Sequence, residues 1–111
     1  LRMGSGTLAD WYEARGGRVI WFGKPHAIVY DIAREILQAA GARDVVAIGD
    51  ALETDILGAN RAGFASALVP AGGVHRVEFD LAYGDLPTPE RLAEVAAAHG
   101  AWPTYALAAL R

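Results

Sequence analysis

A strand-to-helix turn in the middle of the sequence constrains the fold more than any other feature. The run Val45–Ile48 is short, apolar and free of charge, as expected of a parallel strand buried on both faces. Apolar residues at helical spacing follow over 56–63, with Thr54 or Asp55 as the expected cap and Gly63 as the expected stop. The pattern therefore predicts an open α/β sheet, and it places the turn at the edge where such sheets keep their chemistry.

Two carboxylates occupy that turn. Asp50 comes directly after the strand and is expected to project from its carboxyl end, and Asp55 stands before the helix. Residues of these types are also common in turns that have no function, where Asp50 would tighten the turn and Asp55 would complement the helix dipole. Taken alone, the turn leaves both interpretations open.

A similar turn lies upstream. Arg18–Phe22 is another strand-like run, Gly23–Pro25 closes it, and a helical pattern follows over His26–Ala40. Pro25 suits the first helical turn, and the residue before a proline is held extended, which aims Lys24 forward. A lone lysine is usually a solvated surface residue. Two such turns separated by one helix are nevertheless expected to lie at the same edge of the core.

These two turns carry a family resemblance. Gly23–Pro25, followed one helix later by the pattern GDxxxTDxxGA from Gly49 to Ala59, resembles the third and fourth motifs of the haloacid-dehalogenase-like (HAD) hydrolases. The forms of both motifs are similar to the class with an α/β cap, class IIA, which is the nitrophenyl-phosphatase-like group. The resemblance runs from about Ala9 to Gly73. It implies a Rossmann-like three-layer α/β/α sandwich with a parallel sheet.

The resemblance also implies a role for three side chains. Asp50 would be a Mg²⁺ ligand, Asp55 would support the metal site and pair with Lys24, and Lys24 would offset charge on the phosphate and the nucleophile. Mg²⁺ prefers oxygen ligands and keeps several waters, so few protein carboxylates are needed. A fixed cation beside a phosphoryl group acts by positioning and electrostatic stabilisation. The implied activity is Mg²⁺-dependent hydrolysis of a small phosphate monoester through an aspartyl-phosphate.

The nucleophile of this family is missing from the chain. The family attacks phosphorus with the first aspartate of an Asp-x-Asp motif, and no aspartate of this sequence stands two residues before another. The second motif, a Ser or Thr that closes an apolar strand, is also missing. Residues 1–111 are therefore expected to be the carboxy-terminal part of a HAD core domain, inactive in isolation. The alternative is a non-catalytic binding or regulatory module, which a pair other than Asp-x-Asp upstream of Leu1 would favour.

Composition bounds the class of protein. A chain of 111 residues forms one domain at most, and its 53% hydrophobic and 21% charged residues indicate a globular, soluble protein. A net charge of −3 without a basic stripe argues against a nucleic-acid partner. The absence of cysteine excludes disulfides and thiolate metal sites and is compatible with a cytoplasmic location. No apolar stretch approaches the roughly 20 residues of a membrane span, so no membrane partner is expected.

The rest of the chain offers weaker signals. Four further elements are predicted: a helix over Ser5–Arg15 docked on the sheet, a strand over Phe64–Val69, a helix over Pro89–His99 capped by Thr88 and stopped by Gly100, and an edge strand over Trp102–Leu107. The stretch 74–88 has no clear periodicity. His26, His75 and His99 share no ligand spacing and are expected to be surface or satisfied histidines. Glu53 is a candidate for an extra acid near the metal, but it is interpreted as a solvated loop carboxylate.

One partner prediction concerns the strand Val45–Ile48. In the HAD family this strand pairs with the strand that carries the nucleophile, so the resemblance implies that it lacks a neighbour here. It has no proline and no inward charge to protect an exposed edge. The chain is therefore expected to self-associate through this edge, or to bind the missing amino-terminal segment there. Light scattering that shows a stable monomer at high concentration would contradict self-association.

Overall fold

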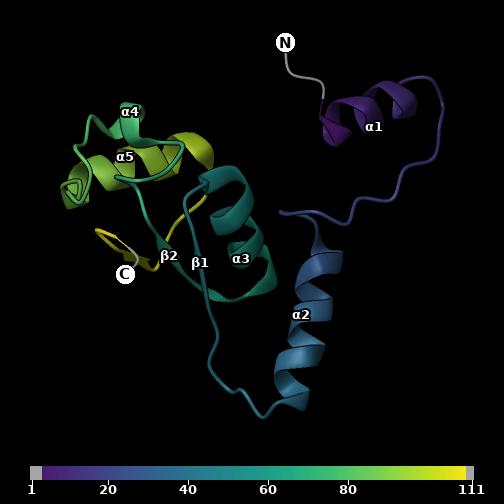
Figure 1. The fold of residues 1–111 in the computed structure, drawn as a ribbon, viewed down its shortest axis with the longest axis horizontal. Helices are drawn as coiled ribbons and strands as arrows, with labels where there is room; N and C mark the ends of the chain where they lie inside the picture. Colours follow the sequence, from purple (N-terminus) through teal and green to yellow (C-terminus); the bar gives the residue numbers. More distant parts are fainter. Residues whose placement is uncertain (1–3, 110–111) are drawn as a thin grey trace.

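Three parallel strands form one sheet. The structure, a computed structural model, describes residues 4–109. Its strands are β1 (Val46–Gly49), β2 (Ala65–Leu68) and β3 (Tyr105–Ala106), in the spatial order β1-β2-β3 (Figure 1). All pairs are parallel, and Ile48 of β1 lies opposite Ala67 of β2. This architecture confirms the α/β fold with a parallel sheet that the sequence predicts.

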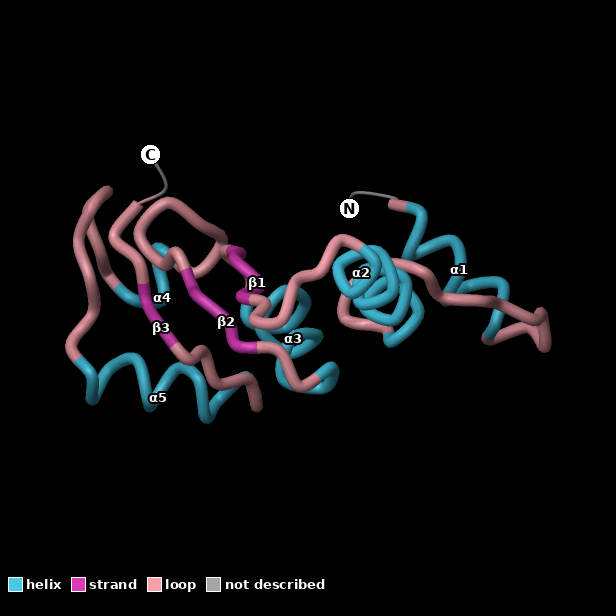
Figure 2. Tube along the Cα trace, turned by 90° about the horizontal axis from the view of Figure 1, so that it is seen from below, coloured by secondary structure: helices cyan, strands magenta, loops and turns pink. Residues whose placement is uncertain are grey.

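Two helices precede the strands and further helical segments connect them. The helical segments are α1 (Ser5–Glu13), α2 (Ala27–Ala39), the π-helical turn η1 (Leu52–Ile56), α3 (Leu57–Ala62), α4 (Arg76–Phe79) and α5 (Pro89–His99). Figure 2 shows α3 and α5 on the same side of the sheet, α2 next to α3, and α1 beyond α2. None of the helices formed by residues 4–109 is long and apolar enough to cross a membrane.

The hydrophobic core lies under the turn that follows β1. Its buried side chains come from η1, β2, α4, α5 and the chain after α5: Leu52, Ile56, Leu68, Phe79, Val95 and Ala101. Leu52 and Ile56 are fully buried, and burial of one such side chain contributes roughly 1.5–3 kcal/mol. The predicted functional turn is therefore held in place by its own apolar residues, which are buried in the core.

Most predicted helix ends are confirmed. The Thr88 hydroxyl accepts a hydrogen bond from the Arg91 amide at 3.2 Å, which caps α5. Gly100 ends α5 with φ 63°, and Gly63 ends α3 with φ 75°. These left-handed conformations favour glycine, which explains why both positions stop their helices. The predicted edge strand after α5 is also present as β3, although it is shorter than the sequence pattern.

The upstream strand is not formed. Arg18–Phe22, predicted to be a strand, runs without regular structure, and Ile20 and Phe22 are 65% and 59% exposed. A strand needs a neighbour to satisfy its backbone groups, and the described part of the chain places no strand beside this segment. The β-branched and aromatic residues of this segment therefore favour a strand that has no neighbouring strand to pair with.

The first helix forms but does not dock on the sheet. α1 covers most of the predicted range, yet none of its residues is buried, and Trp11 and Tyr12 are 53% and 52% exposed. Figure 1 shows α1 well away from the three strands, connected to α2 by an extended segment. The predicted docking is wrong because this extended connection carries α1 past α2 instead of back to the sheet.

The strand β1 is less buried than predicted. The sequence predicts burial on both faces, whereas Val46 and Ile48 are 48% and 49% exposed. Side chains alternate along a strand, so these two point to the same face of the sheet, and this face remains uncovered beside β1. β1 is also one of the two outer strands of the described sheet. Self-association through Val45–Ile48 stays a prediction.

Candidate active site

Asp55 organises the turn after β1. The chain closes a π-helical turn there, with the amides of Asp55 and Ile56 both donating to the Ala51 carbonyl at 3.0 and 3.2 Å. The Asp55 side chain folds back, and its Oδ2 accepts from the amides of Asp50 and Ala51 at 3.1 and 3.2 Å. The predicted cap at Thr54 or Asp55 is therefore wrong, because Ala51 precedes the turn and Asp55 lies inside it. Single π-helical turns are frequent at functional sites.

Lys24 pairs with the same carboxylate. Its Nζ donates to Asp55 Oδ1, and this ion pair joins a half-exposed lysine to an aspartate side chain that is only 10% exposed. The hydrogen bond to Asp55 raises the pKa of Lys24, although burial opposes the effect, and the charge of Asp50 adds to the increase. The structure thus brings Lys24, Asp50 and Asp55 together at the carboxyl end of β1, where the two turns were expected to meet. Their chemical roles stay predictions.

The turn that carries Lys24 ends before the helix. The His26 amide donates to the Gly23 carbonyl at 3.0 Å, and the Lys24–Pro25 peptide is cis. α2 begins only at Ala27, so Pro25 does not occupy the first helical turn as predicted. The hydrogen bond closes the turn before the helix begins, and Lys24 within this turn is directed at Asp55.

Tyr30 holds α2 against the turn. Its hydroxyl donates to the carbonyls of Thr54 and Asp55 at 3.3 and 3.4 Å, and burial raises its pKa. A Cβ on Gly58 would lie 2.1 Å from the Tyr30 hydroxyl oxygen, so the close approach of α2 and α3 requires glycine there. This contact therefore sets the spacing of α2 and α3 beside the turn.

Two glycines make room for the carboxylates. A Cβ on Gly49 would lie 2.2 Å from Cγ of Asp55, and a Cβ on Gly73 would lie 2.4 Å from Cβ of Asp50. Neither glycine has a positive φ, so free space and not backbone conformation selects glycine at both positions.

The Asp50 carboxylate is differently placed from that of Asp55. Within residues 4–109 it takes part in no hydrogen bond or ion pair, whereas both oxygens of Asp55 have protein partners. Asp50 lines an open cavity of about 320 Å³ together with Gly49, Val69 and Tyr83. A carboxylate that is free of protein donors and faces open space fits a hard cation that keeps most of its water.

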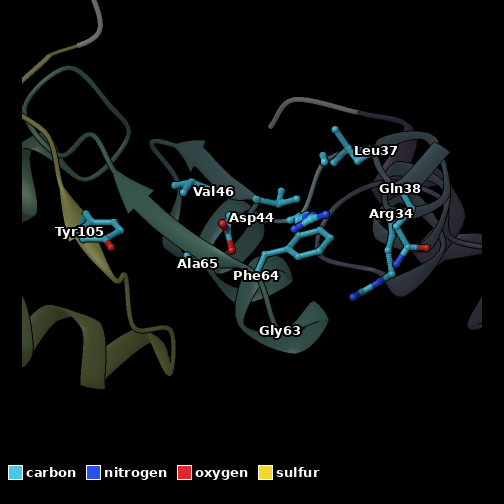
Figure 3. A pocket seen from close by; sticks show the side chains of 12 residues that line it. Arg34, Leu37, Gln38, Asp44, Val46, Gly63, Phe64, Ala65 and Tyr105 are labelled. Carbon is cyan, nitrogen blue, oxygen red and sulfur yellow. The ribbon is translucent and has the colours of Figure 1, made fainter. Parts of the chain in front are cut away.

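A larger cavity lies at the opposite end of the strands. It has a volume of about 470 Å³ and lies between α2 and the amino-terminal ends of β1 and β2, with Arg34, Asp44 and Phe64 on its wall (Figure 3). Ligands of open α/β sheets bind beyond the carboxyl ends of the strands. The smaller cavity at Asp50 is therefore the better candidate for the active site, despite its size.

A second cluster of polar side chains was missed at the sequence level. Glu53, His75 and His99 converge, with ligand atoms within 4.8 Å of one another, and Glu78 contacts both histidines. Glu53 is half-exposed as predicted but is not merely solvated, since it lies 2.5 Å from Nδ1 of His99. The three residues come from η1, the loop before α4 and the end of α5, so no sequence spacing could relate them. His26 lies elsewhere and stacks on Trp21.

Hydrogen bonds set the charges in this cluster. The hydrogen bond to Glu78 raises the pKa of His99, against the effect of burial, and the charge of Glu53 raises it further. The hydrogen bond to His99 in turn lowers the pKa of Glu78. The pKa of the base is raised and that of the acid is lowered, so both shifts favour the charged forms, as expected for one ion pair.

The contribution of the His99–Glu78 ion pair to the free energy of unfolding is expected to be largest at mildly acidic pH. The contribution of His99 is complete below pH 6.5 and is lost as pH rises through its raised pKa in the folded protein. That of Glu78 is complete above pH 4.5 and is lost as pH falls through its lowered pKa. Urea unfolding in metal-free buffer is expected to show the largest stabilising effect of His99, relative to His99→Gln, between these two values. An effect that grows steadily toward alkaline pH would contradict the ion pair.

Known proteins share both the sequence pattern and the fold. The family model described as HAD-hydrolase-like matches residues 21–101. A haloacid-dehalogenase-like hydrolase from Brucella suis 1330 is 30% identical with a TM-score of 0.57, over 96% of this chain and 36% of that one. A p-nitrophenyl phosphatase from Archaeoglobus fulgidus is 25% identical with a TM-score of 0.59, over 94% of this chain and 35% of that one.

These matches cover only part of each known structure. The chain spans about a third of the length of each of the two structures. No match was found among curated proteins. The phosphatase neighbour is consistent with the capped class IIA that the motif forms indicate. Because the family model covers most of the chain, including both turns of the candidate site, the protein belongs to the HAD-like hydrolase family.

Proposed function

We propose that this chain supplies the metal- and phosphate-binding end of a Mg²⁺-dependent phosphohydrolase. One observation carries the proposal: the free carboxylate of Asp50 lies beside the Lys24–Asp55 ion pair at the carboxyl end of β1. Asp50 offers a carboxylate ligand for Mg²⁺, and Lys24 offers a positive charge for the phosphate. Phosphoryl transfer requires this combination.

Each of the three side chains has a separate task in this proposal. Asp50 holds Mg²⁺ through its carboxylate, and the bound ion would neutralise charge on the phosphate. Lys24 is half-exposed, so its ammonium can contact a phosphate oxygen while it keeps its bond to Asp55. Asp55 is saturated by the amides of Asp50 and Ala51 and by Lys24, so it is a positioning residue that orients the other two.

We infer that the nucleophile of the family lies outside this chain. None of the aspartates forms an Asp-x-Asp pair, so the chain alone would not form the aspartyl-phosphate that the family mechanism implies. We therefore propose that residues 1–111 are the carboxy-terminal part of a core domain, inactive in isolation, and that the parent acts on a small phosphorylated substrate.

The test compares the 111-residue chain with a polypeptide extended upstream of Leu1. The extended polypeptide is expected to hydrolyse p-nitrophenyl phosphate only with Mg²⁺, and the shorter chain is expected to show no turnover. Asp50→Asn is expected to lower the rate about 100-fold or more, because it removes a charge that acts in the transition state. Asp44→Asn is the matched control, since Asp44 is exposed at the opposite end of β1 and its loss should leave the rate unchanged.

Two outcomes would overturn the proposal. Turnover by the rigorously purified 111-residue chain that Asp50→Ala abolishes would show that no upstream nucleophile is needed. An extended polypeptide without Asp-x-Asp and without turnover would favour the alternative function, a non-catalytic binding or regulatory module with a HAD-like fold.

A further inference from the structure

The cluster of Glu53, His75 and His99 lies outside the proposed active site. It is built from η1, from the loop before α4 and from the last residue of α5. His75 is 5% exposed, so one of its members is fixed inside the protein. Its imidazole ring meets that of His99 edge to face, with ring centroids 4.8 Å apart. Two imidazoles and a carboxylate in contact are a donor set that transition metals prefer over Mg²⁺.

Glu78 orients both imidazole rings. Its Oε2 lies 3.0 Å from Nδ1 of His75, and its two oxygens lie 2.9 and 3.0 Å from Nε2 of His99. The other ring nitrogens, Nε2 of His75 and Nδ1 of His99, are then directed at Glu53, at 3.4 and 2.5 Å from its carboxylate oxygens. A carboxylate behind a histidine is the usual arrangement around a bound zinc ion, where it fixes the ring and its tautomer.

We propose that Glu53, His75 and His99 bind a transition-metal ion of the Zn²⁺ type, with Glu78 as the positioning residue behind both histidines. The ligand atoms would be a carboxylate oxygen of Glu53 and the two ring nitrogens that face it, Nε2 of His75 and Nδ1 of His99. Ligands at about 2.0–2.2 Å from a tetrahedral zinc ion lie roughly 3.3 Å from one another. The ligand atoms of the three residues lie within 4.8 Å of one another, so side-chain shifts of about 1–2 Å are needed. Three protein ligands leave a fourth position for water.

Two interactions must be replaced. Nδ1 of His99 must lose its proton and its 2.5 Å contact with Glu53 before it can bind a metal ion. The Leu52 amide donates to Nε2 of His75 at 2.9 Å, and a metal ion at that nitrogen would take its lone pair. A single backbone hydrogen bond contributes much less than the binding of a zinc ion to protein ligands. The exchange therefore favours the ion, and it couples the site to the turn that carries Asp50 and Asp55.

Metal binding is tested on the 111-residue chain after treatment with a chelator. Competition with a zinc-sensitive dye is expected to show one Zn²⁺ per chain with micromolar or tighter affinity, and Co²⁺ is expected to give the absorption bands of a tetrahedral site. Glu53→Gln and His99→Gln are each expected to weaken binding by at least about 10-fold, and Glu78→Gln by about 10- to 100-fold. Both Glu53 and Glu78 are exposed enough for these variants to fold.

Matched controls separate this site from other histidines and carboxylates. His26→Gln, Glu90→Gln and Asp50→Asn lie outside the cluster and are expected to leave the zinc affinity unchanged. In amide NMR spectra, zinc is expected to shift the Leu52 signal in the unsubstituted 111-residue chain. It is not expected to shift this signal in His99→Gln at the same zinc concentration. Absence of micromolar binding, or binding that survives both Glu53→Gln and His99→Gln, would overturn the proposal. Loss of binding in Asp50→Asn would overturn its separation from the Mg²⁺ site.

Discussion

Replacing Asp55 with alanine is expected to lower the free energy of unfolding by about 3 kcal/mol. The side chain is nearly buried, and its two oxygens accept from the amides of Asp50 and Ala51 and from Lys24. Alanine would leave both amides without an acceptor at the point where the chain leaves β1. Urea unfolding monitored by circular dichroism measures the effect, with Asp55→Asn as an intermediate variant that keeps the volume and one acceptor.

Lys24→Met is the control for the ion pair. Lys24 is half-exposed, so its pairing is screened by water and its loss is expected to cost about 1 kcal/mol or less. The Asp55 carboxylate would keep its two backbone donors in this variant. A cost for Lys24→Met as large as that for Asp55→Ala would mean that the ion pair, and not the backbone hydrogen bonds, stabilises the turn.

Gly58→Ala is expected to cost about 3 kcal/mol, because it overpacks the contact between α2 and α3. The new methyl group would lie 2.1 Å from the hydroxyl oxygen of Tyr30 and 2.3 Å from its Cζ, and Tyr30 is buried with both carbonyl partners on the same turn. Relief of the clash requires α2 to move away from α3. Thermal and urea unfolding measure the loss.

The control for Gly58→Ala is another helical glycine. A methyl group on Gly6 in α1 would meet no neighbouring side chain closer than 4.0 Å, so Gly6→Ala is expected to be neutral or stabilising through its higher helix propensity. Tyr30→Ala combined with Gly58→Ala is expected to cost less than the sum of the two changes, because they share one contact. Additive costs would show that the methyl group acts elsewhere.

Local sequence was sufficient where a single segment carries its own signal. The helix Pro89–His99 begins and ends as predicted, because Thr88 caps it and Gly100 takes the left-handed conformation that stops it. The turn after β1 was readable in outline, since apolar runs on both sides of Asp50 locate the strand and the helix, but its cap was not. The family motifs then identified Lys24 as the partner of Asp55, which the structure places in contact.

Features that depend on distant neighbours could not be read in this way. Arg18–Phe22 has the composition of a strand, but strand formation requires hydrogen bonds to another strand, and none lies beside it in the described region. The exposure of Ile48 likewise depends on distant parts of the chain, because it is set by which elements cover the sheet and not by its own side chain.

The histidine cluster shows the limit most clearly. Glu53, His75 and His99 have no spacing in common, and each alone resembles an ordinary surface or buried residue. Their meeting results from the packing of η1, α4 and α5 around Leu52, Phe79 and Val95. The amino-acid sequence thus specified the short-range elements and the motif residues of this protein, because caps, turns and apolar periodicity act within a few residues. Long-range packing alone brought the remaining polar groups together, since contacts between segments far apart in the chain depend on the whole core.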